Sequence, residues 1–388
     1  MRKVAFLHEE FPFGGAETVT LDVASFFKDS GYFLYIFAAK VSSSKIPQSI
    51  SNIEGVEMPY SYNDKRNVPF LIENIKRLGI EILVSPNPNN LNLYFDPIKK
   101  ENLCKLVFVS HGVPFWEEIL RQEFVKRNIR KSFKKAFEWY LFRALKYKLG
   151  YGIKRLTKAY TNIYNSVDVF GVLCEDYGRD LSEKIGVRYE GSKFFVLPNS
   201  VKVPDKVDRD KRQELCYVGR LSYADKRVDR LLKIWSLIEK EYNDWILNIV
   251  GEGPELDNLI ALSKELNLER VFFRGFSKNP KEYYDRASIV CLTSTSESWG
   301  LVLVEAQANG CVPVAFDCSA GVRTILSPSW ENGILIPPFD IDEYAKALSI
   351  LMSNRELRSK IAENGMIAVR RFVPEVTLKE WESMFSKL

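Results

Sequence analysis

Short apolar runs alternate along the chain with amphipathic segments of helical period. The first run, residues 4–7, precedes a helical pattern that starts near Ala16 and stops before Gly31. Similar runs predict strands at 33–37, 80–85, 105–110, 168–173, 194–197, 214–218, 245–250, 270–274, 287–292 and 312–316. Strands that alternate with helices form mainly parallel sheets, so the pattern predicts an α/β protein.

A polar, charged stretch interrupts this pattern. Leu197-Pro198-Asn199-Ser200 is followed by the charged run 202–212, which is typical of a linker. We therefore predict a first domain at 1–197 and a second that starts at 198. The length of 388 residues is enough for two cores of ordinary size.

Composition narrows the class of protein further. The first apolar run is too short for a signal peptide, and no segment approaches the roughly 18 apolar residues of a membrane span, so a cytoplasmic location is expected. The six cysteines form no CxxC pair and are expected to be buried thiols. With two histidines in the chain, a histidine-rich metal site is excluded.

The positive charge is concentrated in one segment. Residues 121–160 contain 13 Lys or Arg and only Glu123 and Glu138 as acids, and aromatic and aliphatic residues recur there at helical spacing. The pattern favours an amphipathic helix on an anionic membrane, at the inner face of the plasma membrane. A merely solvated face and single-stranded nucleic acid are the alternatives. The membrane-facing candidates are Arg130, Lys131, Lys134 and Lys135.

Two carboxylates mark the stretch 294–310. A strand at 287–292, a polar turn and an apolar helix from Leu301 to Ala308 are expected there. The backbone N–H groups of Ser298, Trp299, Gly300 and Leu301 would then lie at the helix N-terminus and attract an anion. Glu297 and Glu305 could each accept hydrogen bonds from a sugar on either side of a diphosphate. These features are typical of a nucleotide-sugar site.

Cationic residues follow another predicted strand. Arg220 and Lys226 come after the strand at 214–218, where the ligand edge of a parallel sheet is expected, and both suit a diphosphate. Lys226 is preferred over Arg227. His111 directly follows the strand at 105–110, also at a ligand edge. Asp340-Ile341-Asp342 precedes a helical pattern and is interpreted as an N-cap rather than a metal site.

Several short motifs share their order and spacing with one family. They are Gly14-Gly15-Ala16-Glu17, Ser110-His111-Gly112, Leu197-Pro198-Asn199, Val218-Gly219-Arg220-Leu221, Val250-Gly251-Glu252-Gly253 and the stretch 294–310. On these residues the chain resembles the retaining glycosyltransferases of family four. The resemblance implies the GT-B fold, two Rossmann-like domains with parallel sheets that face each other across a cleft.

The resemblance also implies roles for residues. His111, Arg220, Lys226 and Glu297 would be catalytic: His111 contacts the donor sugar, Arg220 and Lys226 neutralise the leaving diphosphate, and Glu297 holds the transferred sugar. The implied donor-binding residues are Gly15, Asn199, Gly219, Gly253, Phe276, Ser298, Trp299, Gly300, Leu301 and Glu305. The second domain would span 198–371, and 372–388 would form a helix that returns to the first. No metal or other cofactor is expected.

The expected function is transfer of a hexose or N-acetylhexosamine from a nucleotide diphosphate sugar, with UDP favoured, to a hydroxyl of a lipid-linked saccharide. The anomeric configuration would be retained. Alternatives are a GDP-mannose-type donor, a soluble acceptor and a catalytically silent nucleotide-sugar-binding scaffold. A Rossmann oxidoreductase is disfavoured, because Gly251-Glu252-Gly253 lacks the third glycine of the dinucleotide fingerprint. Nucleic acid is not an expected partner.

Overall fold

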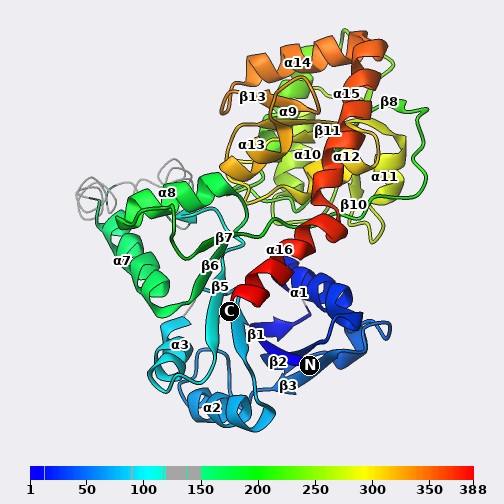
Figure 1. The fold of residues 1–388 in the computed structure, drawn as a ribbon. Helices are drawn as coiled ribbons and strands as arrows, with labels where there is room; N and C mark the ends of the chain where they lie inside the picture. Colours follow the sequence, from blue (N-terminus) through cyan, green and yellow to red (C-terminus); the bar gives the residue numbers. More distant parts are fainter. Residues whose placement is uncertain (13, 89–90, 117, 119–136, 138–149) are drawn as a thin grey trace. The chain divides into compact units, whose positions relative to one another are not determined.

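The computed structural model describes residues 1–12, 14–88, 91–116, 118, 137 and 150–388. These residues form two compact units (Figure 1). Unit 1 contains Met1–Phe115, the described part of Tyr140–Ser200, and Pro374–Leu388, whereas unit 2 contains the described part of Trp116–Trp139 and Val201–Val373. The chain therefore changes unit after Ser200 and after Val373, a few residues later than the boundaries expected from the sequence.

Unit 1 is built on a parallel sheet. Its seven described strands lie in the order β3-β2-β1-β4-β5-β6-β7. The strands are β1 (Arg2–Phe11), β2 (Tyr32–Val41), β3 (Ile53–Glu57), β4 (Ile82–Ser85), β5 (Lys105–Val109), β6 (Val169–Val172) and β7 (Phe194–Val196). The helices are α1 (Gly15–Phe26), α2 (Asn67–Leu78), α3 (Leu91–Lys100), α7 (Tyr151–Ser166), α8 (Glu175–Ile185) and α16 (Pro374–Lys387), with 3-10 turns η1 (Phe27–Asp29) and η2 (Ser43–Lys45).

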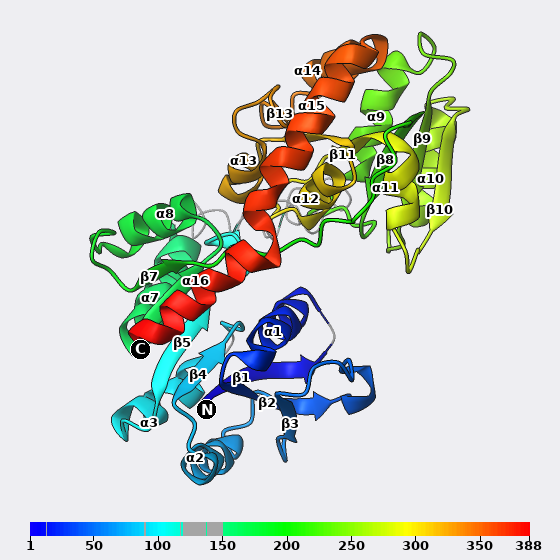
Figure 2. The same ribbon diagram turned by 45° about the vertical axis from the view of Figure 1, so that its right-hand side comes forward.

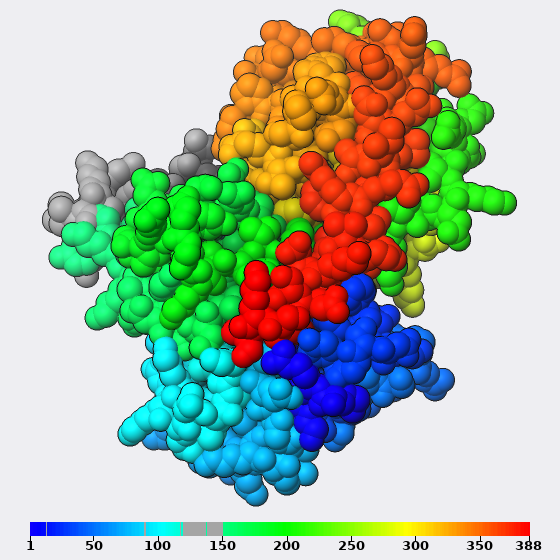
Figure 3. Space-filling view, in the orientation of Figure 1, coloured from blue at the N-terminus to red at the C-terminus, as the bar shows by residue number. Residues whose placement is uncertain are grey.

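The C-terminal helix α16 belongs to the core of unit 1. Alternate residues of a strand face opposite sides of its sheet, so Val4 and Phe6 of β1 share one face. Val23 and Phe27 pack on this face together with Trp381 and Phe385 from α16. Figures 2 and 3 show α16 beside α1 and partly at the surface of the molecule.

Unit 2 contains a second parallel sheet. Its six described strands lie in the order β10-β9-β8-β11-β12-β13. They are β8 (Arg212–Val218), β9 (Ile246–Val250), β10 (Val271–Gly275), β11 (Ala287–Leu292), β12 (Val312–Phe316) and β13 (Ile334–Ile336). The helices are α9 (Val228–Ile238), α10 (Leu256–Glu265), α11 (Lys281–Arg286), α12 (Leu301–Ala308), α13 (Ala320–Leu326), α14 (Ile341–Ser353) and α15 (Arg355–Ala368), and η4 (Val369–Phe372) follows α15.

Both faces of this second sheet are covered. One face packs against α9 and α14, with Trp235 and Tyr344 among the fully buried side chains. The other face carries a smaller cluster that includes Tyr284 of α11 and Ala306 of α12. A strand that is buried on both faces has no solvent-exposed side for polar residues. The sequence of β11, ASIVCL, accordingly shows no alternation of apolar and polar residues, and all of its residues are buried.

The strand order reverses between β8 and β11, which are neighbours in space but not in sequence. Loops that leave the carboxyl ends of strands on either side of such a switch point diverge, and ligands of open α/β sheets bind between them. In unit 2 these loops are 219–227 and 293–300. They contain Arg220, Lys226 and Glu297.

Most predicted elements are confirmed, and the strands at 287–292 and 312–316 have the expected bounds. The strands β3 and β13 were not expected. Asp340 is confirmed as the N-cap of α14, because its carboxylate accepts a hydrogen bond from the N–H of Glu343 at 3.0 Å. All six cysteines are free thiols, as expected, and four of them are buried, whereas Cys104 and Cys318 are only partly buried.

The predicted membrane-facing residues Arg130, Lys131, Lys134 and Lys135 lie outside the described residues. Within the described ranges, no helix is both long enough and apolar enough to traverse a bilayer.

Candidate functional site

The turn between β11 and α12 has the predicted strand-turn-helix form. Gly300 caps α12 with a φ of 87°, a left-handed conformation that favours glycine, and Leu301 starts the helix. The first helical turn therefore begins at Leu301. Ser298 and Trp299 lie in the loop before the cap, so the prediction that their N–H groups belong to the helix end is corrected.

The loop after β8 positions Arg220. The side chain of Arg220 donates to Asp225 Oδ2 at 2.9 Å, and the hydroxyl of Ser222 donates to the other oxygen of Asp225. The backbone is also held, because Tyr217 Oη donates to the carbonyl of Arg220 at 2.9 Å. Asp225 thus ties both ends of this loop together.

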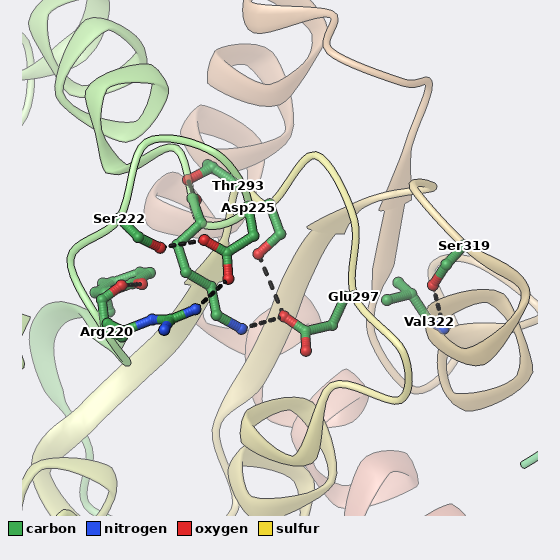
Figure 4. Close-up of polar contacts among 10 residues, drawn as sticks. Arg220, Ser222, Asp225, Thr293, Glu297, Ser319 and Val322 are labelled. Atoms are coloured by element: carbon green, nitrogen blue, oxygen red, sulfur yellow. Dashed lines mark hydrogen bonds and ion pairs between the residues drawn. The ribbon is translucent and has the colours of Figure 1, made fainter. Parts of the chain in front are cut away.

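The two loops at the switch point meet through an ion pair. Lys226 Nζ donates to Glu297 Oε2 at 2.6 Å, and Ser294 Oγ donates to the same oxygen at 3.3 Å. The N–H of Thr295 also donates to the carbonyl of Asp225 at 2.7 Å. Figure 4 shows Arg220, Asp225 and Glu297 in this arrangement. The structure therefore brings three predicted catalytic residues together in unit 2.

The charged groups of this site differ in exposure. The side chain of Arg220 is 67% exposed, whereas those of Lys226 and Glu297 are 21% and 13% exposed. Burial raises the pKa of Asp225, whereas the hydrogen bonds from Ser222 and Arg220 and the nearby cations lower it. The lowering effects together are larger, so the net pKa is below the ordinary value. Asp225 is therefore ionised at neutral pH. An exposed guanidinium beside it can turn to an incoming anion.

Lys226 and Arg227 have different partners. Arg227 Nε donates to Asp229 Oδ1 at 2.9 Å, and its guanidinium lies over the ring of Tyr223. Arg227 also has a left-handed backbone with a φ of 51° at the start of α9. Lys226 is the residue that contacts Glu297, which agrees with the preference expected from the sequence.

Glycines let the loops of unit 2 approach one another. A Cβ atom at Gly251 would lie 1.9 Å from the carbonyl oxygen of Gly219, and one at Gly253 would lie 2.3 Å from that of Leu221. In return, the N–H of Leu221 donates to the carbonyl of Glu252 at 2.8 Å. Gly253, predicted to bind the donor, thus packs against the loop that carries Arg220. Gly321 similarly admits the carbonyl of Ser298, 2.2 Å from an added Cβ.

Two further donor-binding candidates lie around this sheet edge. Phe276 follows β10, is 66% exposed, and its N–H donates to Glu252 Oε1 at 3.4 Å. Trp299 is buried, and its ring packs edge-on against Phe372 with 5.1 Å between centroids. Trp299 Nε1 is shielded from solvent and has no hydrogen-bond partner among the described residues. The structure therefore places Phe276 at the surface and Trp299 in the interior.

Glu305 is held by a residue that the sequence did not single out. Tyr284 Oη donates to Glu305 Oε2 at 2.7 Å. Burial raises the pKa of Glu305 and the hydrogen bond from Tyr284 lowers it, with a net pKa above the ordinary value. The carboxylate that was predicted to bind a ribose is therefore half-buried and fixed at one oxygen.

Unit 1 has its own polar cluster between β1 and α1. His8, which lies within β1 rather than at its end, is 1% exposed. Its Nδ1 lies 3.3 Å from Glu17 Oε1, and its Nε2 lies 3.0 Å from Thr20 Oγ1. A carboxylate can only accept, so His8 donates from Nδ1 when Glu17 is ionised. Burial raises the pKa of Glu17, but the hydrogen bonds from His8 and from the backbone, together with the nearby histidines, lower the pKa by more, so that the net pKa is below the ordinary value.

His111 belongs to the same neighbourhood. Burial and the nearby His8 lower the pKa of His111 to about 4, against the raising effects of Asn199 and Glu17. Its imidazole is therefore neutral at physiological pH. His111 Nδ1 and Asn199 Oδ1 are both shielded from solvent and have no hydrogen-bond partner among the described residues. Gly15 is the first residue of α1, and an added Cβ there would contact nothing within 4 Å.

No group of three His, Cys, Asp or Glu residues in the described part of the chain is arranged to hold a metal ion. A pocket in unit 2 lies at the opposite edge of the sheet from Arg220 and Glu297, where strands begin. It is lined by 207–209, Lys211, Ser288, Gly310 and one side of α15. Its charges are already paired, as in Arg209 with Glu363 at 3.5 Å, so it is separate from the site described above.

Part of the chain that contains these residues matches a known protein family. Residues 202–367 match the family Glycosyl transferases group 1. This part of the chain is therefore similar to the glycosyl transferases group 1 domain. This domain contains Arg220, Lys226, Glu297 and Glu305, together with their partners Asp225 and Tyr284.

Relatives of the group 1 domain include bacterial glycosyltransferases. The chain is 35% identical over 188 residues to an uncharacterized glycosyltransferase of Haemophilus influenzae, which is 48% of this chain and 53% of that protein. It is 28% identical over 211 residues to the lipopolysaccharide 1,6-galactosyltransferase of Salmonella typhimurium, which is 52% of this chain and 57% of that protein. The chain thus spans little more than half the length of these relatives.

A solved structure shares the fold. The Anabaena protein HepE, crystallised with UDP, aligns over 100% of both chains with a TM-score of 0.74 and 17% sequence identity. This likeness and the two parallel sheets confirm the predicted GT-B fold class.

Sequence reasoning missed two residues that shape these sites, Asp225 and Tyr284, and it missed the pairing of Glu17 with His8. Asp225 lies directly before Lys226 and five positions after Arg220, so its acidic character among cations was a usable signal. Tyr284 gave no such signal, since its partner is reached only through the fold.

Proposed function

We propose that this protein is a retaining glycosyltransferase that moves a hexose or N-acetylhexosamine from a nucleoside diphosphate sugar, with UDP favoured, to a hydroxyl of a lipid-linked saccharide. The observation that carries this proposal is the ion pair between Lys226 and Glu297, beside Arg220, at the switch point of the group 1 domain. It places cations for a diphosphate next to an acceptor for sugar hydroxyls.

The proposed chemistry needs positioned charge rather than a protein nucleophile. The bond between the anomeric carbon and the diphosphate oxygen breaks as the acceptor oxygen attacks on the same face. The departing phosphate oxygen takes the acceptor's proton. Arg220 and Lys226 stabilise the charge that builds on the diphosphate, which is the dominant kind of contribution in such reactions. His111, as a neutral imidazole, hydrogen-bonds the transferred sugar.

Glu297 acts in this proposal as a hydrogen-bond acceptor for the transferred sugar. Its Oε2 is already occupied by Lys226 and Ser294, which hold the carboxylate in place. Glu305 accepts from the ribose of the nucleotide. The proposal includes no metal, because the cations of the protein supply the positive charge; transfer that stops in excess EDTA and returns with Mg²⁺ would contradict this part.

The proposed acceptor is a polyprenyl-diphosphate-linked sugar or another glycolipid at the inner face of the plasma membrane, where the basic segment 121–160 meets anionic lipid. The galactosyltransferase relative acts on lipopolysaccharide, which supports a surface-polysaccharide role. Sedimentation with phosphatidylglycerol vesicles tests the membrane contact. Salt-sensitive binding is expected, and an absence of binding at low salt would contradict it.

Titration calorimetry of the full chain with UDP and with GDP is the first test. We expect UDP to bind without metal or acceptor, as supported by the UDP complex of HepE. Preferential GDP binding would favour a GDP-mannose-type donor over a UDP-sugar. Binding of neither nucleotide would overturn the proposed function.

Product analysis separates the enzyme from a silent scaffold. With UDP-glucose, UDP-galactose or UDP-N-acetylhexosamine and a lipid-linked saccharide extract, we expect UDP release and a product that keeps the donor's anomeric configuration by NMR. Nucleotide binding without release of UDP for any donor would favour the scaffold. An inverted product would contradict the retaining mechanism.

A further inference from the structure

Tyr284 makes a defined contact with the carboxylate that we assign to the nucleotide ribose. Its hydroxyl donates to Glu305 Oε2 at 2.7 Å, from α11 to α12. A phenol has a single hydrogen, so this bond commits the hydroxyl to one oxygen of Glu305. In the described part of the chain, Glu305 Oε1 receives no hydrogen bond from the protein. One oxygen is therefore fixed and the other is left to accept from a ligand.

The position of Tyr284 is itself fixed from several sides. Its ring is 2% exposed and packs with Cys216, Ala306 and Cys311. Its carbonyl accepts from Lys211 Nζ at 2.8 Å and from Cys311 Sγ at 3.0 Å. A hydroxyl on a ring that is held this firmly restrains its partner, because the carboxylate cannot rotate without losing the bond.

We propose that Tyr284 is the positioning residue of the ribose subsite: it holds Glu305 in one orientation, so that Oε1 accepts a hydrogen bond from a ribose hydroxyl. This inference rests on the proposed function. It predicts that the protein distinguishes a ribonucleotide from a deoxyribonucleotide, and that the distinction depends on the Tyr284 hydroxyl as well as on Glu305.

The charge of Glu305 provides a second readout. Burial raises the pKa of Glu305 and Tyr284 lowers it. Without the hydroxyl the pKa rises further, so the carboxylate is neutralised at a higher pH and ribose binding fails earlier on acidification.

The groups around Glu305 do not obscure the pH dependence of UDP binding, because they stay neutral or have charged partners of their own. Burial raises the pKa of the nearby Cys311 thiol to about 12 and that of Cys216 well above its usual range, so both stay neutral. Other charged groups on or against these helices have their own partners: Lys211 with carbonyls of α11, Lys281 with Asp285, Glu282 with Ser277, Arg323 with Asp317, Glu363 with Arg209 and Arg371 with carbonyls of α13. Arg286 lies over the ring of Tyr283.

The test compares Tyr284→Phe with Tyr283→Phe in the full chain. Tyr283 is the adjacent tyrosine of α11, and its ring contacts Arg286 rather than Glu305. Affinities for UDP and for 2′-deoxy-UDP are measured by calorimetry from pH 5 to pH 8. Tyr284→Phe is expected to weaken UDP binding by about 3- to 10-fold, the usual range for one lost hydrogen bond, with little change for 2′-deoxy-UDP. Tyr283→Phe is expected to match the wild type for both.

The pH dependence sharpens the same experiment. In Tyr284→Phe the midpoint for acid loss of UDP binding is expected to lie at a higher pH than in the wild type, because the hydrogen bond that lowers the pKa of Glu305 is lost. Tyr284→Phe that keeps both the wild-type ribose preference and the wild-type midpoint would overturn the inference. Equal loss of affinity for UDP and 2′-deoxy-UDP would also overturn it, because this pattern indicates general damage to the domain.

A double-mutant cycle shows whether Tyr284 acts through Glu305. In a Glu305→Gln background the carboxylate is absent, so adding Tyr284→Phe is expected to change the ribose preference by less than about twofold. A further loss as large as in the wild-type background would contradict a positioning role. Failure of the wild type to bind either UDP or GDP would instead overturn the proposed function, so the two failures are distinguishable.

Discussion

The two units place different kinds of groups near the C-terminal halves of their central strands. In unit 2, charged residues from two loops are paired, Lys226 with Glu297 and Arg220 with Asp225. In unit 1, the corresponding residues are His8 and His111, which are shielded and arranged around Glu17, and His111 is neutral at physiological pH. Charge is needed where a diphosphate leaves, whereas the hydroxyl groups of a sugar need oriented hydrogen bonds.

The largest expected effect comes from breaking the charged pair in unit 2. Lys226→Ala removes a cation and its ion pair with Glu297, whose side chain is only 13% exposed. Loss of one such group typically raises the barrier by about 3 to 4 kcal/mol, so we expect transfer to slow by roughly 100- to 1000-fold. Steady-state release of UDP measures it. Lys233→Ala, an exposed lysine of α9, is the control and should retain the wild-type rate. A Lys226→Ala rate within about threefold of the wild type would contradict the role of this pair.

The bounds of β11, α12 and β12 follow from sequence because local patterns determine them: a continuous apolar run, an apolar helix and the glycines Gly300 and Gly310 at its ends. The strand β3 was missed because IEGVE is an edge segment that is only partly buried and has no apolar run. The strand β13 was missed because it has only three residues.

The candidate site was predictable in its residue types but not in its pairs. Arg220, Lys226 and Glu297 stand beside glycines and strand ends, which mark a ligand edge. The bond between Lys226 and Glu297 joins residues 71 positions apart, and Tyr284 lies 21 positions from Glu305. Such contacts depend on how β8 and β11 pair, which no local pattern encodes.

The second prediction contrasts the glycines of the two units. Gly251→Ala would place a Cβ atom 1.9 Å from the Gly219 carbonyl oxygen, with a φ of 143° that alanine rarely adopts. We expect a loss of about 3 kcal/mol of folding free energy, because both overpacking and backbone strain act there. Gly15→Ala meets nothing within 4 Å and lies in a helix, so its stability should be unchanged or up to about 1 kcal/mol greater. Chemical denaturation compares the two variants. Equal stability of both would show that the loop packing in unit 2 is looser than described.

The third prediction concerns the neutral histidine of unit 1. The pKa of His111 is about 4 in the folded chain, against an ordinary value of 6.5, so the unfolded chain binds the proton first as pH falls. The contribution of His111 to the free energy of unfolding should therefore be fully present above pH 6.5. It should decrease by about 2 kcal/mol between pH 7 and pH 5. Urea unfolding at several pH values measures the slope, and His111→Asn should remove that part of it. An unchanged slope in His111→Asn would mean that His111 titrates normally.

The smallest expected effect separates orientation in unit 1 from charge in unit 2. Glu17→Gln keeps the shape of a side chain that lies 3.3 Å from His8 Nδ1, but it replaces a charge-assisted hydrogen bond with a neutral one. A change of about 1 kcal/mol follows, so transfer to the saccharide acceptor should slow by roughly fivefold. The affinity for UDP should not change, because Glu17 lies in unit 1 and the proposed nucleotide site lies in unit 2. Asp29→Asn, an exposed acid of η1 in the same unit, is the control for lost negative charge. If Glu17→Gln weakens UDP binding as much as it slows transfer, the division between a charged donor site and an orienting acceptor site is wrong.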